Sequence, residues 1–199
     1  MPVAVTEAPY QSLPIEAPRK RWSRAECEAL EAIGLWEQQK LELVGGELIS
    51  KMGKNRRHTN ALSSMLAWLI KTFGEKFVNP EAPIDVAPED NPTNEPQPDI
   101  IVLKRSTWEF ESNPVPADLN LVVEIADTTL GFDLKTKATL YARAGILEYW
   151  VLDVSARRLL VHREPVAGRY VDVVIYSDQE SVSPLAVPHA QFHVADAFR

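Results

Sequence analysis

The sequence predicts an α/β fold, in which a mixed central sheet is flanked by helices and further antiparallel strands lie toward the C-terminus. Residues 121–126 are apolar apart from Glu124, a pattern typical of a buried central strand. A helical pattern follows over residues 133–144, and an apolar run over residues 148–153 returns to the strand pattern. Strands that alternate with helices in this way are typical of the α/β class.

The length and composition predict a single globular domain. We expect a flexible leader over residues 1–20, which is rich in Pro and Ala, and one domain over residues 21–199. Cys27 is the single cysteine, which excludes an internal disulfide and a thiolate metal cluster. No apolar run reaches the ~20 residues that span a bilayer, and no signal-peptide pattern is present. The expected location is therefore the cytoplasm.

The net charge of −7 argues against generic affinity for nucleic acid, because Lys and Arg contacts with phosphate dominate such binding. Part of the acidity could nevertheless belong to metal-binding carboxylates, and a local basic patch can act despite the total charge. Two clusters of basic residues are present: Arg19, Lys20, Arg21 and Arg24, and then Lys51, Lys54, Arg56 and Arg57. For both clusters we favour a solvated surface.

The first elements are a capped helix and a hairpin. Ser23 and Glu26 form a capping box for a helix over residues 24–39. The apolar positions expected to pack this helix are Ala25, Leu30, Ile33 and Leu35. In residues 41–50, the pair Gly45-Gly46 predicts a two-residue turn that sets Val44 opposite Glu47 and Leu43 opposite Leu48. Glu42 and Glu47 then share a face, and the spacing does not decide which of them points inward.

The middle of the chain predicts a long helix over residues 57–77, for which Gly74 is a plausible terminator. We expect His58, at its start, to cap the helix or to form a hydrogen bond. A short strand is expected over residues 84–87 and a buried strand over residues 100–103. After residue 153, the strands expected are 159–163, 170–176 and 191–194. The side chains of Trp108 and Trp150 are expected to serve packing, or in the case of Trp150 a dimer contact, in preference to base stacking.

Two of the expected inner strands each carry one acid. Glu124 lies within its strand, and Asp99 precedes the strand over residues 100–103. A buried carboxylate needs a partner, either another group or a metal ion. Lys137 falls within the apolar arc of the helix over residues 133–144, where its ammonium could reach these acids, while Lys135 lies at the edge of that arc. The alternative is that Lys137 forms an ordinary surface pair with Asp133, four residues earlier.

Several of these residues together resemble a known family. The motifs are Pro98-Asp99, V-V-E-I-A-D around Glu124, D-x-x-x-K ending at Lys137, and Y-A-x-A-G-x-x-E-Y-W over residues 141–150. They resemble the Uma-two family of restriction-endonuclease-like proteins, within the PD-(D/E)XK nuclease superfamily, and the likeness extends from about Arg24 to the end of the chain. The superfamily pattern would place a lysine at position 126, where this chain has Ala126. The resemblance therefore implies that the lysine comes from Lys137.

The resemblance implies a restriction-endonuclease-like fold and a metal-dependent endonuclease acting on nucleic acid, with DNA as the expected substrate. Asp99, Glu124 and the main-chain carbonyl of Ile125 would hold Mg²⁺ or Mn²⁺, the hard cations that oxygen ligands select. The catalytic residues would be Asp99, Glu124 and Lys137, joined by Glu47 from the hairpin, although Glu42 stays open for that position. His58 corresponds to a histidine that is common in the family.

The sequence leaves two alternative functions open, and it also predicts a homodimer. The first rival is a catalytically inactive binding module that keeps the nuclease fold, which Ala126 and the acidic charge favour. The second is an unrelated metal hydrolase that acts on small phosphoesters. We also expect a homodimer, because enzymes that cut both strands of a duplex use two sites and an apolar edge around Tyr149 and Trp150 could be self-complementary.

Overall fold

The structure is a computed structural model that describes residues 19–35, 39–51 and 55–198. Most of the predicted leader, residues 1–18, lies outside the described residues, and so does Lys54 of the second basic cluster. Within the described part of the chain, no helix is both long and apolar enough to cross a membrane.

A six-stranded mixed sheet forms the centre of the molecule, as predicted. Its strands, in spatial order, are β3 (Val78–Pro80), β4 (Ile100–Leu103), β5 (Leu119–Ala126), β6 (Glu148–Asp153), β7 (Arg158–Val166) and β8 (Arg169–Ser177). Strands β5 and β6 are parallel, and every other neighbouring pair is antiparallel. The α/β class, the mixed sheet and the antiparallel strands toward the C-terminus are therefore confirmed.

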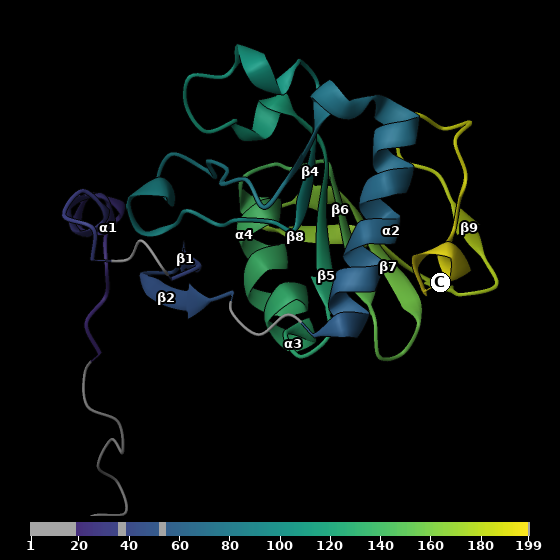
Figure 1. Cartoon of the computed structure of the whole chain (residues 1–199), viewed down its shortest axis with the longest axis horizontal. Helices are drawn as coiled ribbons and strands as arrows, with labels where there is room; N and C mark the ends of the chain where they lie inside the picture. Colours follow the sequence, from purple (N-terminus) through teal and green to yellow (C-terminus); the bar gives the residue numbers. More distant parts are fainter. Residues whose placement is uncertain (1–18, 36–38, 52–54, 199) are drawn as a thin grey trace, which may run out of the picture.

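Helix α2 (Arg56–Phe73) covers one face of this sheet (Figure 1). It buries Ala61, Met65 and Leu69 against alternate side chains of β4, β5 and β6. The helix ends at Gly74, whose φ of 94° favours glycine, so the predicted terminator is confirmed although the helix stops four residues before residue 77. Short strands β9 (Ser181–Val182) and β10 (Phe192–His193) close the C-terminal end of this core.

A second helical segment lies on the other side of β5 from α2 (Figure 1). It consists of α3 (Leu130–Phe132), a π-helical turn over Asp133–Lys137, and α4 (Ala138–Arg143), in place of the single regular helix predicted over residues 133–144. The remaining short helices are 3₁₀ turns: Glu75–Phe77, Asn91–Thr93, Thr107–Glu109, Pro116–Asp118 and Val194–Phe198. The π turn adds a residue to one turn of the helix, and it falls at the candidate site.

Helix α1 (Arg24–Glu31) and the hairpin of β1 (Leu41–Val44) and β2 (Glu47–Ser50) lie together at one side of the molecule (Figure 1). The capping box at Ser23 is confirmed, and so is the hairpin register. The predicted length of α1 was wrong, because the helix ends at Glu31. The predicted packing face was also wrong, because Ile33 and Leu35 are 72% and 60% exposed. Only Cys27 of α1 is buried, since a helix at the edge of the fold presents a narrow face to the core.

Three further expectations were wrong. The segment 84–87 is not a strand, although Ile84 is fully buried, because its main chain bonds to loop residues such as Pro96 instead of joining the sheet. Trp108 is 81% exposed and does not pack in the core. Tyr149 and Trp150 are fully buried on opposite faces of β6, so they form no apolar edge for a dimer.

Candidate active site

The two acids predicted from the inner strands lie side by side at one end of the sheet. Ile100 of β4 pairs with Val123 of β5, which sets Asp99 next to Glu124. Both residues are 3% exposed. The Asp99 carboxylate accepts a hydrogen bond of 2.8 Å from the main-chain N–H of Ile125, so one strand of the sheet orients the acid of its neighbour.

Lys137 reaches this acidic pair from the π-helical turn. Its Nζ lies 2.7 Å from Oε1 of Glu124 and 2.9 Å from Oε2 of Glu42, and the residue is 2% exposed. The hydroxyl of Tyr141, from α4, donates to the same Glu124 oxygen at 3.1 Å. Asp133 is also buried and accepts a hydrogen bond of 2.6 Å from Thr129, so Asp133 and Lys137 do not form a surface pair.

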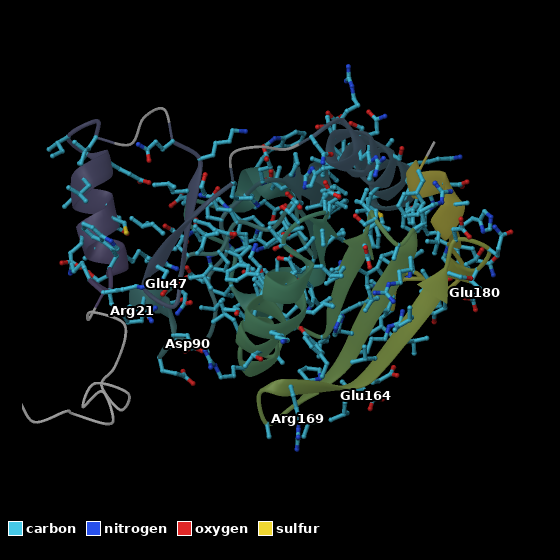
Figure 2. All side chains as sticks on the ribbon, turned by 90° about the horizontal axis from the view of Figure 1, so that it is seen from below. Arg21, Glu47, Asp90, Glu164, Arg169 and Glu180 are labelled. Atoms are coloured by element: carbon cyan, nitrogen blue, oxygen red, sulfur yellow. The ribbon has the colours of Figure 1, made fainter. Side chains whose placement is uncertain are left out.

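The hairpin contributes Glu42, and the structure corrects the placement of Glu47. Glu42 is 4% exposed and accepts a hydrogen bond of 3.0 Å from the main-chain N–H of Gln97. The side chain of Glu47 is 42% exposed and pairs with Arg21 at 2.9 Å, beside it in Figure 2. The two glutamates share a face of the hairpin, but Glu47 lies at the turn, where that face extends beyond the pocket.

Two residues that contact Asp99 were not assigned to the site from the sequence. Nζ of Lys51 lies 3.5 Å from Oδ1 of Asp99 and donates to the carbonyl of Gln97. Nε2 of His58, on the first turn of α2, lies 3.4 Å from Oδ2 of Asp99. The sequence did contain a pattern that could have identified Lys51. Side chains alternate along β2, so Lys51 lies on the same face of the hairpin as Ile49, and Ile49 pairs with Glu42. His58 forms the kind of polar contact that was expected of it, but its partner is a site acid.

These side chains surround a pocket of about 110 Å³. Five carboxylates and two ammonium groups are among the lining groups, and the acids are Glu42, Asp99, Glu124, Asp127 and Asp133. Asp127, at the end of β5, accepts hydrogen bonds from Asn55 and from Ser155. Because negative groups outnumber positive ones, an anionic substrate would need an additional cation in order to enter.

Burial and charge shift the ionisation of the central pair. Burial raises the pKa of Glu124 to about 8, although the charge of Lys137 opposes this shift. For Lys137, burial acts to lower the pKa, but the charges of Glu124, Glu42 and Asp133 outweigh it and raise the pKa above its ordinary value. Burial likewise raises the pKa of Asp133. Lys137 therefore keeps its proton at neutral pH, so it can donate hydrogen bonds but cannot act as a base.

The donor set fits a hard cation that retains water ligands. Mg²⁺ is usually held by one or two carboxylates together with waters and substrate phosphate, and Asp99 and Glu124 supply two carboxylates. The side chain of Ile125 lies in the core on the opposite face, so the main chain of Ile125 is the part that faces the pocket. Among residues 19–35, 39–51 and 55–198, no group of three or more Asp, Glu, His or Cys side chains is placed to hold a metal ion.

Comparisons with known proteins support a nuclease-like fold. A family model, Uma2, described as "Putative restriction endonuclease", matches residues 25–195. Among solved structures, the chain is similar to "a putative nuclease belonging to DUF820 from Anabaena variabilis ATCC 29413", with a TM-score of 0.61 and 14% identity. The match covers 81% of this chain and 90% of that one, and at such identity it shows the fold alone. A comparison with curated proteins gave no match.

Proposed function

This chain belongs to the Uma2 family, and from that premise we propose that it is a metal-dependent endonuclease that hydrolyses phosphodiester bonds in nucleic acid, with DNA as the expected substrate. The observation that carries the proposal is the buried ammonium of Lys137, held between Glu42 and Glu124 and close to Asp99. A buried group of acids and a lysine facing a pocket is a common arrangement at catalytic sites.

Asp99, Glu124 and the main-chain carbonyl of Ile125 would hold Mg²⁺ or Mn²⁺. When bound, the ion would lower the pKa of an attacking water and neutralise charge on the phosphate. The hydrogen bond from the Ile125 N–H fixes the Asp99 carboxylate, and the hydroxyl of Tyr141 fixes that of Glu124. These bonds keep the two acids in place before substrate arrives, which avoids the cost of reorganising them during the reaction.

Lys137 would act as a fixed cation. Its raised pKa suits a donor that orients the attacking water and stabilises negative charge on the pentacoordinate phosphorus, and does not suit a base. Glu42 holds the ammonium from the side opposite Glu124 and so sets its position. Lys51, beside Asp99, supplies a second positive charge to the same pocket.

Metal binding should be visible as a gain in thermal stability. At a Mg²⁺ or Mn²⁺ concentration of about 100 times Kd, stabilisation of about 2.7 kcal/mol is expected. For a chain of this size, this corresponds to a rise in Tm of roughly 5–10 °C. Asp99→Ala should abolish the rise, whereas Asp90→Ala, which removes an acid paired with the exposed Arg143, should preserve it. The measurement is a thermal melt over a metal titration, followed by cleavage of mixed DNA and RNA.

The outcomes separate the rival functions. A rise in Tm together with metal-dependent cleavage of nucleic acid supports the nuclease. If millimolar metal changes neither the wild-type Tm nor the Asp99→Ala Tm, and no cleavage occurs, the chain is a binding module with the nuclease fold. Turnover of a chromogenic phosphodiester without cleavage of nucleic acid indicates a hydrolase of small phosphoesters.

The expected homodimer is proposed at another surface, the edge strand β8. Val171, Val173 and Ile175 alternate along this strand and are 54%, 47% and 52% exposed. Two copies paired antiparallel about Val173 would set Val171 opposite Ile175, and each copy would cover the other's free sheet edge.

Light scattering tests this assembly. A mass near twice the 22.3 kDa of the chain is expected for the wild type. Val173→Lys should give a monomer, because two like charges would meet at the centre of the paired strands. Val166→Lys, at the end of β7, is the control and should remain dimeric. A monomeric wild type at concentrations of tens of micromolar, an order-of-magnitude working range, would refute the dimer.

A further inference from the structure

A second hollow, of about 420 Å³, lies at the same end of the sheet as the catalytic pocket. Arg57 and Asn60 of α2 line it from one side, and Ser155 and Arg157 of the loop between β6 and β7 line it from the other. No carboxylate is among the described residues that line it. Its lining is therefore positive, in contrast to the acidic lining of the catalytic pocket.

The two arginines are suited to binding an anion. The guanidinium of Arg157 lies 4.6 Å from the centre of the Phe198 ring, and its Nε donates to Asp178 at 3.0 Å, so the group is held in one orientation. Arg57 is exposed and forms no ion pair with any residue that the structure describes. Arginine is the preferred side chain for phosphate, because its planar group can donate two parallel hydrogen bonds.

The hollow and the catalytic pocket share a wall. The hydroxyl of Ser155, which lines the hollow, donates to Asp127, which lines the catalytic pocket, at 3.1 Å. The first turns of α2 line both cavities, since His58 lines the catalytic pocket while Arg57 and Asn60 line the hollow. The two cavities are therefore adjacent, so one extended strand could contact both.

Three residues of the first basic cluster each have an acidic partner, as Arg157 does, so Arg57 is the cation that distinguishes the hollow. Lys20 pairs with Glu26 at 2.6 Å, Arg21 with Glu47, and Arg24 with Asp85 at 2.7 Å. In a chain with a net charge of −7, a hollow whose described lining has two arginines and no acid favours a phosphate group, although Asp178 offsets part of the charge of Arg157.

We infer that the hollow between Arg57 and Arg157 binds a backbone phosphate of the same nucleic-acid strand whose scissile phosphate enters the catalytic pocket. This inference rests on the proposed function and adds the direction in which the substrate crosses the protein. The strand would leave the catalytic pocket over the bond between Ser155 and Asp127 and continue onto the α2 side of the sheet.

Binding of fluorescently labelled DNA over a series of NaCl concentrations, at a fixed Ca²⁺ concentration that supplies the cation the acidic pocket needs, tests the inference on the full chain. Arg57→Ala should weaken binding by about 3- to 10-fold at low salt, and should lower the slope of log K against log[salt] by about 1, the amount expected for the loss of one phosphate contact. Arg57 is exposed, so the variant should keep the wild-type Tm.

Lys71→Ala is the matched control. Lys71 is an exposed cation on the same helix, 14 residues from Arg57 and thus roughly 21 Å away at 1.5 Å per residue. Its loss changes the net charge of the protein by the same amount but should leave the slope unchanged. The double variant Arg57→Ala/Arg157→Lys should bind no better than Arg57→Ala alone, because lysine cannot donate the paired hydrogen bonds of arginine.

The possible failures are distinguishable. If the wild type binds and cleaves nucleic acid but Arg57→Ala and Lys71→Ala have equal slopes, the phosphate site is refuted and the nuclease proposal stands. If the wild type neither binds nor cleaves nucleic acid, the proposed function fails and the inference fails with it. If inorganic phosphate raises the Tm of the wild type but not of Arg57→Ala, and nucleic acid does not bind, the hollow is a site for a free anion and the inference is overturned.

Discussion

Lys137→Met should lower the rate of nucleic-acid cleavage by ~10²-fold or more, the usual scale for removing a positioned donor from a site that excludes water. The ammonium lies within 3 Å of both Glu42 and Glu124, so no other described cation occupies the same position between these two acids. Methionine has a similar length but carries no charge and no donor. The measurement is cleavage at saturating Mg²⁺, with the fold of the variant checked by circular dichroism.

The same substitution should destabilise the protein by about 3–5 kcal/mol at neutral pH, because it leaves buried carboxylates without their partner. The destabilisation caused by Lys137→Met should grow as the pH rises. The pKa of Glu124 is about 8 in the folded protein against 4.5 for a free glutamate, so between these values the unfolded state binds fewer protons and stability falls with increasing pH. In the wild type, the charge of Lys137 holds the pKa of Glu124 down, so its removal should raise that pKa further and extend the pH range over which stability falls.

Added metal should partly restore the stability of Lys137→Met, since a cation can neutralise the acids in place of the ammonium. Lys135→Met is the internal control, because Lys135 is exposed two residues away on the same turn, and it should change neither cleavage nor stability appreciably. Equal cleavage by Lys137→Met and the wild type would remove the proposed role. A larger loss from Lys135→Met would mean that the other lysine acts.

Glu42→Gln should lower cleavage by up to ~10²-fold, although Glu42 is not proposed to bind metal. Glutamine can still accept the hydrogen bond from the Gln97 N–H, so the hairpin should keep its place. The variant nevertheless lacks the charge that holds Lys137 on the side opposite Glu124. A displacement of a catalytic group by about 1 Å can reduce a rate by this amount. The rate should be measured together with metal affinity, which is expected to change little.

Glu47→Gln, on the same hairpin, is the control for Glu42→Gln. Glu47 shares a face with Glu42, but its side chain is 42% exposed and pairs only with the exposed Arg21 among the described residues. Its substitution should leave cleavage unchanged and alter stability by at most about 1 kcal/mol, the usual limit for an exposed ion pair. If Glu47→Gln reduced cleavage more than Glu42→Gln, the placement of these two residues relative to the site would be refuted.

Local patterns were sufficient for much of the fold. The apolar runs predicted β4, β5 and β6, and the residues Gly45-Gly46 predicted the turn and register of the hairpin, because these features depend on neighbours in the sequence. The errors have a common cause. Segment 84–87 and residues 32–35 have suitable local propensity, but whether they form a strand or extend a helix depends on contacts with distant residues, which periodicity does not report.

The sequence by itself determined that two inner strands each carry a buried acid and that a lysine faces inward from the following helix, since alternation and helical period fix the direction of a side chain relative to its own element. Only the tertiary structure decided between Glu42 and Glu47, and brought Lys51 and His58 to Asp99. These choices depend on where the hairpin and the start of α2 pack against the sheet. The positions of elements relative to one another are fixed by long-range packing, which no local period records.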